Sequence, residues 1–184
     1  MKFYDDYFEL MYKAMKNINH DEMDKAVELI KHTSKSGKKL IFAGNGGSAA
    51  MSSHATVDFT KAAKIRAINF NEADLLTCFA NDYGYENVFA KALDHYADAG
   101  DLFIVISSSG KSENVNRAAV RAKELGLNII TLSGFEPENP LREKGHFNFW
   151  CDSKAYNIVE MTHHIWLVAM VDRIVGDIYY SSNI

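Results

Sequence analysis

The chain has 184 residues, 47% of them hydrophobic and 24% charged, which is the composition of an ordinary globular domain. Its 20 basic and 24 acidic residues give a net charge of −4, so there is no positive footprint for nucleic acid or an anionic membrane. The longest apolar run, 165–171, is far short of the ~20 residues of a membrane span, and the N-terminus carries no signal segment. We therefore expect a cytoplasmic protein without nucleic-acid or membrane partners, with Cys78 and Cys151 as reduced core residues.

The N-terminal part predicts two helices, at 2–17 and 21–36, with Asp21 as the cap of the second and Gly37 as its end. The first helix carries an apolar stripe larger than a small sheet needs, which favours packing against another subunit. This stripe consists of Phe3, Tyr7, Leu10, Met11, Ala14, Met15 and Ile18.

From Lys38 onward, strand and helix patterns alternate. The predicted strands lie at 38–43, 65–70, 102–107, 127–132 and 147–151, and the predicted helices at 48–62, 72–80, 85–97, 112–125 and 156–178. Near-continuous apolar strands separated by helices are typical of a parallel sheet covered on both faces. We predict an α/β three-layer sandwich with a five-stranded parallel sheet over residues 38–184, preceded by N-terminal helices, residues 1–37, that serve oligomerisation.

Two short loops that follow predicted strands carry glycines and hydroxyl groups. The first, 44–49, reads Gly-Asn-Gly-Gly-Ser-Ala, and the second, 107–112, reads Ser-Ser-Ser-Gly-Lys-Ser. Glycine lets the backbone approach a ligand, and N–H groups at a helix start attract an anion. Both loops lie beyond the carboxyl ends of strands, where such folds bind ligands. They predict a pocket for a phosphorylated metabolite, bound by Asn45, Gly46, Gly47, Ser48, Ser107, Ser108, Ser109 and Ser112.

Each loop has other interpretations. Gly44, Gly46 and Ala49 also fit a dinucleotide-binding pattern, but Glu72 is a late candidate for the acidic residue that this pattern expects about 20 positions on. The first loop also fits a plain structural turn. In the second loop, helix capping would explain Ser112 but not the other three serines.

Ionisable side chains on two predicted helices are candidates for the chemistry. His54 and Asp58 are four residues apart and share a face, where they could hold a metal, exchange protons or form a surface pair. On the last helix, Glu160 and His163 are the natural proton carriers, and His164 follows Glu160 by four residues.

Asp82 falls between two predicted helices, in the segment 81–85, Asn-Asp-Tyr-Gly-Tyr. It is either a cap or turn residue, or a substrate-binding residue that contacts a sugar hydroxyl.

Together these motifs resemble the sugar isomerase (SIS) domain, and most closely its phosphoheptose isomerase group. The resemblance covers about residues 38–135 and rests on the segments 44–50, 81–89, 100–101, 106–115 and 131–134, with His54. It implies a flavodoxin-like SIS fold, a homotetramer built through helices, and aldose–ketose isomerisation of sedoheptulose 7-phosphate or a related sugar phosphate through an enediol. In that reaction Asp58 or Glu160 would take the proton, and His163 or His54 would shuttle it at the sugar oxygens.

The resemblance also implies a zinc site, from which this chain departs. The group has His-x-x-x-Glu where this chain has His54-x-x-x-Asp58, and the shorter arm moves the carboxylate oxygen by more than ~1 Å. When the last helix is aligned on Glu160, Val159 and Leu167 occupy the positions of the Gln and His ligands.

His163 lies one helical turn after Val159 and one turn before Leu167, on the same face of the helix. Either the site is rebuilt around His163, with Glu160, His54 and Asp58 nearby, or the family reaction is lost. In the second case the chain would be a non-catalytic module that senses a sugar phosphate or binds a protein partner.

Overall fold

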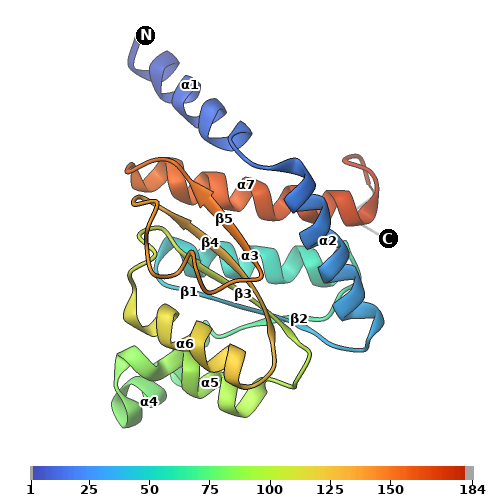
Figure 1. The fold of residues 1–184 in the computed structure, drawn as a ribbon, viewed down its shortest axis with the longest axis vertical. Helices are drawn as coiled ribbons and strands as arrows, with labels where there is room; N and C mark the ends of the chain where they lie inside the picture. Colours follow the sequence, from blue (N-terminus) through green and yellow to red (C-terminus); the bar gives the residue numbers. More distant parts are fainter. Residues whose placement is uncertain (1, 181–184) are drawn as a thin grey trace.

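The computed structural model describes residues 2–180 and confirms the predicted three-layer α/β architecture (Figure 1). All neighbouring strands are parallel, in the order β2-β1-β3-β4-β5. The strands are β1 (Leu40–Gly44), β2 (Ala67–Asn69), β3 (Leu102–Ser107), β4 (Asn128–Gly134) and β5 (Phe147–Cys151). The helices are α1 (Lys2–Lys16), α2 (His20–Lys35), α3 (Gly47–Lys61), α4 (Ala73–Tyr83), α5 (Val88–Tyr96), α6 (Glu113–Glu124) and α7 (Tyr156–Val175), with the 3-10 helix η1 (Tyr85–Asn87). The strand order changes direction between β1 and β3, where doubly wound sheets bind ligands.

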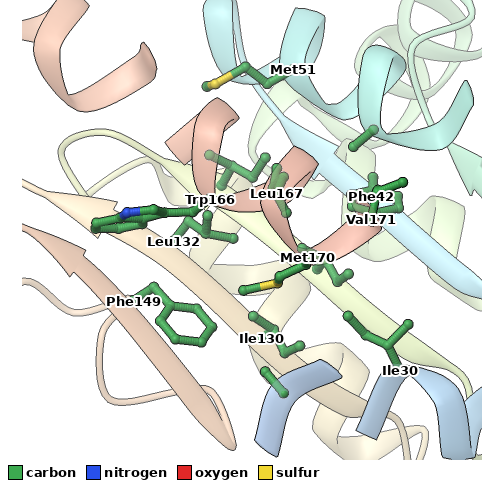
Figure 2. Packing of buried hydrophobic residues seen from close by; sticks show 14 of the residues in the cluster. Ile30, Phe42, Met51, Ile130, Leu132, Phe149, Trp166, Leu167, Met170 and Val171 are labelled. Atoms are coloured by element: carbon green, nitrogen blue, oxygen red, sulfur yellow. The ribbon is translucent and has the colours of Figure 1, made fainter. Parts of the chain in front are cut away.

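Side chains of the sheet alternate between two cores, because successive residues of a strand point to opposite faces. Phe42, Ile104 and Ile130 face one core, which α2, α3 and α7 cover. Figure 2 shows α7 residues such as Trp166 and Leu167 packed there against the strands. The alternate positions of β1, β3 and β4 face a second core, which α5 and α6 cover. Burial of both faces explains why the strands are apolar throughout.

Asn19, rather than Asp21, caps α2. Its Oδ1 accepts hydrogen bonds from the N–H groups of Asp21 and Glu22 at 3.0 and 3.2 Å. Asn19 has extended backbone just before the helix, which turns its side chain back toward the free N–H groups, whereas Asp21 already lies inside the first turn. The end of α2 is as predicted, because Gly37 follows it with φ at 72°.

The two N-terminal helices differ in how they pack. Helix α2 buries Ala26, Val27 and Ile30 in the core, whereas α1 projects from the body and buries only its C-terminal part (Figure 1). Within residues 2–180, no helix is long and apolar enough to cross a membrane.

A buried ion pair joins the starts of β1 and β3. It lies at the amino ends of these strands, whereas the two loops lie at their carboxyl ends. Asp101 is fully buried, and its Oδ2 accepts from Lys39 Nζ at 2.6 Å and from the N–H of Asp98 at 2.8 Å. Its Oδ1 accepts from the N–H of Lys39 at 3.0 Å. Removing one partner of such a pair leaves an uncompensated group in the interior.

We therefore expect Asp101→Ala to lower the free energy of unfolding by about 3 kcal/mol in urea denaturation. Asp98→Ala is the matched control, because it removes the other carboxylate that binds Lys39. The Asp98 side chain is 71% exposed, so its loss should cost at most about 1 kcal/mol. Equal losses in the two variants would contradict a special role for the buried carboxylate.

Candidate functional site

The two loops meet at the carboxyl ends of β1 and β3. Gly44 pairs with Ile106 in the sheet, so the two loops that follow β1 and β3 begin side by side. They line a cavity of about 230 Å³, to which α7 contributes Tyr156 and Glu160. All eight loop residues singled out from the sequence line this cavity: Asn45, Gly46, Gly47, Ser48, Ser107, Ser108, Ser109 and Ser112. That they bind a ligand stays a prediction.

The first loop presents the N-terminus of α3 to the cavity. Gly46 has φ at 53°, in the left-handed region that favours glycine. Gly47 begins α3, and a Cβ on it would collide with the carboxylate of Glu160. The Glu160 carboxylate therefore rests against the helix N-terminus, whose dipole stabilises negative charge.

The second loop is a tight turn, in which the N–H of Gly110 donates to the carbonyl of Ser107 at 2.9 Å. Ser112 occupies the N-cap position of α6, but its side chain makes no capping bond and accepts instead from Ser107 Oγ at 3.2 Å. Capping therefore does not explain Ser112. The Ser108 hydroxyl is buried and has no hydrogen-bond partner among residues 2–180. This hydroxyl is therefore available to bond with a group that enters the cavity.

The loops are held in place by three side chains that were not predicted as site residues: Tyr85, Asn114 and Asn139. Asn45 and Asn114 exchange two amide hydrogen bonds, both of 2.9 Å, and the hydroxyl of Tyr85 donates to Asn45 Oδ1 at 2.9 Å. The side chain of Asn45 thus braces the first loop against α6. Buried Asn139 packs against Gly110 and donates to Ser133 Oγ at 3.1 Å. Tyr85 and Asn114 lie in segments that carry the resemblance, but their contacts with Asn45 join parts of the chain 40 and 69 residues apart, and Asn139 lies in an irregular loop, so the sequence did not indicate this role.

His163 is fully buried and does not line the cavity. Its Nε2 donates to the carbonyl of Ser133 at 2.9 Å, and Nδ1 has no partner among the described residues. Burial lowers the pKa of His163 to about 4, so the side chain is neutral near pH 7. This corrects the expectation that the site is rebuilt around His163, because the stripe of α7 that contains it, with Val159 and Leu167, faces the sheet.

His164, one residue further, points the other way. Its Nε2 lies 2.7 Å from Nδ1 of His54, and Nε2 of His54 lies 3.1 Å from Oδ2 of Asp58. Burial, and after it the neighbouring His54, lower the pKa of His164 below its ordinary value. The predicted pair His54–Asp58 therefore exists, and the histidine of α7 that joins it is His164.

Asp82 does not line the cavity. Helix α4 continues to Tyr83, three residues beyond its predicted end, so Asp82 lies in its exposed last turn rather than between helices. There it accepts from Asn81 Nδ2 at 2.8 Å and contacts the thiol of Cys78 at 3.7 Å. Cys78 is exposed, contrary to the expected core position, whereas Cys151 is buried; both are free thiols.

The residues present do not fit the zinc site that the resemblance implies. Val159 and Leu167 are fully buried among apolar side chains and offer no ligand atom. In residues 2–180, no group of three or more His, Cys, Asp or Glu side chains is arranged to hold a metal ion. His54 and Asp58 remain, and their geometry is that of a hydrogen bond between them.

Comparison with known proteins extends these observations. The parallel sheet and the hydroxyl-rich loops at its switch point place the protein in the class of doubly wound α/β proteins. The SIS domain family matches residues 2–134. Phosphoheptose isomerase from Fusobacterium nucleatum is 31% identical over 91% of this chain and 89% of its own length. The probable phosphoheptose isomerase from Thermoplasma volcanium is 34% identical over 95% of this chain and 91% of its own length. The structure of phosphoheptose isomerase GmhA from Neisseria gonorrhoeae superposes with a TM-score of 0.86, at 26% identity, over 95% of this chain and 98% of that one.

The chain therefore belongs to the SIS domain family, in its phosphoheptose isomerase group. It is an enzyme of the isomerase class. The family match ends at Gly134, before β5 and α7, where the chain departs from the group's zinc ligands.

The buried His163 makes stability depend on pH. Its pKa of about 4 in the folded protein lies below the ordinary 6.5, so its contribution is fully present above pH 6.5 and is lost as the pH falls toward 4. This difference corresponds to about 3 kcal/mol.

We expect His163→Gln, which keeps a donor for the Ser133 carbonyl, to lose less stability than the parent between pH 7 and pH 4, measured by urea denaturation at each pH. Parallel stability curves for the two proteins would show that His163 does not titrate in this way.

Proposed function

We propose that this enzyme interconverts the ketose and aldose forms of a sugar phosphate, with sedoheptulose 7-phosphate as the substrate to test. The observation that carries the proposal is the buried, unpartnered Ser108 hydroxyl in a cavity that the N-terminus of α3 and further serines line. Several convergent donors without a positive side chain suit a phosphate that is held mainly by hydroxyls and backbone N–H groups. The names of the relatives favour a seven-carbon sugar.

Glu160 is the base of the proposed reaction. Its carboxylate is in the cavity, against Gly47, and a sugar whose phosphate rests on the serine loop would extend toward it. Glu160 takes the proton from C1 of the ketose and returns it to C2 through an enediol intermediate. His163 takes no part, because it is buried between α7 and the sheet.

The experiment incubates the purified protein with sedoheptulose 7-phosphate and follows aldose formation by NMR. We expect turnover, a loss of kcat of about 100-fold or more in Glu160→Gln, and a rise of KM of about 10-fold in Ser108→Ala, because one hydrogen bond to a charged group is worth about 1.5 kcal/mol or more. Ser36→Ala, at the exposed end of α2, is the control and should behave as the parent. Saturable binding of sugar phosphates without any turnover would refute the proposal.

The enzyme forms a homo-oligomer through α1, and a tetramer is the state that the resemblance favours. The aromatic side chains of Phe3, Tyr4 and Phe8 are 71%, 65% and 64% exposed and contact one another along the helix. An exposed apolar surface of this kind is typical of an interaction site, and a second copy of the same helix would bury it symmetrically.

We expect the double variant Phe3→Ser, Phe8→Ser to have a smaller mass in solution than the parent, measured by light scattering after gel filtration. Lys13→Ser, on the same helix and 70% exposed, should keep the parent mass. An unchanged mass in the double variant would place the contact between subunits elsewhere.

A further inference from the structure

We propose that Asp58, His54 and His164 form a proton relay that takes the place of the zinc site of this group, with His164 as the residue that exchanges protons with the substrate oxygens. The inference rests on the proposed isomerase function and deepens it. It starts from two contacts across the α3–α7 interface: 2.7 Å between His164 Nε2 and His54 Nδ1, and 3.1 Å between His54 Nε2 and Asp58 Oδ2.

The carboxylate determines where the protons of this chain lie. Asp58 can only accept, so Nε2 of His54 carries a hydrogen and donates to it. In neutral His54, Nδ1 then carries a lone pair and accepts from Nε2–H of His164. This arrangement leaves the lone pair of His164 on Nδ1, so His164 is a base that Asp58 supports through His54.

The same geometry does not suit a single metal ion. The two nitrogens of His54 lie on opposite edges of the ring, and each already faces a different partner. The rings of His54 and His164 are also nearly perpendicular, at 82°, with centroids 4.6 Å apart. One ion bound to all three side chains would break both hydrogen bonds, and the two further ligand positions, Val159 and Leu167, have no donor atoms to compensate.

Helix α7 carries the relay next to the cavity. Tyr156 and Glu160 line the cavity, and His164 follows one turn further, about 6 Å along the axis. His54 lies two turns into α3 from Gly47, and α3 packs against α7. A sugar that runs from the serine loop along α7 therefore meets Glu160 first and His164 next.

In this reaction one proton moves between carbons and one between oxygens. Glu160 takes the proton from C1, the electron pair of that bond forms the C1–C2 double bond, and O2 becomes an oxyanion. His164 Nδ1 takes the proton of the O1 hydroxyl and delivers a proton to O2. The electron pair left on O1 forms the C1=O1 double bond, and the pair of the C1–C2 double bond forms a new C2–H bond with the proton held by Glu160. C1 is oxidised and C2 is reduced, without an external oxidant or reductant. Asp58, through His54, stabilises the cationic form of His164 during this step.

The test measures turnover of sedoheptulose 7-phosphate by the full-length protein, after chelator treatment and dialysis, with and without added zinc. We expect the parent to keep its activity without metal. His164→Gln, whose amide can still donate to His54 but cannot accept a proton from O1, should lose kcat by about 100-fold with KM within about threefold of the parent. His164→Ala should show the same loss and should regain part of kcat when imidazole is added, which a merely structural role would not produce.

Positioning and catalytic roles are separated by two further variants. Asp58→Asn should lower kcat less than His164→Gln and should not respond to imidazole. His95→Ala, an exposed histidine on α5 at the other face of the sheet, is the control and should match the parent.

Each other outcome overturns the relay. Activity that disappears with chelation and returns with zinc would show that the site is a metal centre. Unchanged kcat in both His164 variants would show that the base lies elsewhere, while the isomerase proposal stands. A parent protein that turns over no sugar phosphate, with or without zinc, would refute the proposed function and the relay together.

Discussion

The parallel pairing of β1 with β3 is the constraint on which the rest of the site depends. Gly44 lies beside Ile106 in the register, so β1 and β3 end at the same level of the sheet. The chain therefore enters α3 and α6 from neighbouring loops. The reciprocal amide pair of Asn45 and Asn114 then holds the first loop to the start of α6. The cavity is lined by the start of α3 and by the hydroxyls of the second loop, and its lining residues include no lysine or arginine.

The chemistry beside that cavity depends on which side chains of α7 face the sheet and which face the cavity and α3. One residue along a helix turns the side chain by about 100°, so adjacent residues face different surroundings. His163 falls in the stripe that packs on the sheet, where burial keeps it neutral. His164 falls in the stripe shared with Glu160, which faces the cavity and α3. Two neighbouring histidines thus have opposite roles, one in the core and one in a polar cluster.

The orientation of α7 also explains why the zinc site that the resemblance implies is not present in this chain. Val159 and Leu167 belong to the core-facing stripe. Figure 2 shows Leu167 with Trp166 and Met170 against the sheet. As apolar side chains, Val159 and Leu167 contribute to the core and offer no atom that could bind a metal ion. On α3 the half-buried Asp58 and the exposed His54 form a hydrogen-bonded pair, which His164 extends.

The sequence by itself determined the strand and helix order, the parallel sheet and the two loops that line the cavity, because hydrophobic periodicity and glycine- and hydroxyl-rich turns are local signals. It also pointed to His54, Asp58 and Glu160 as neighbours of the site. Only the tertiary structure decided that His164 rather than His163 joins them, that Asp82 ends a helix outside the cavity, and that Asn139 braces the serine loop. These outcomes depend on contacts between segments far apart in the chain, such as His54 with His164 across 110 residues, which no local pattern encodes.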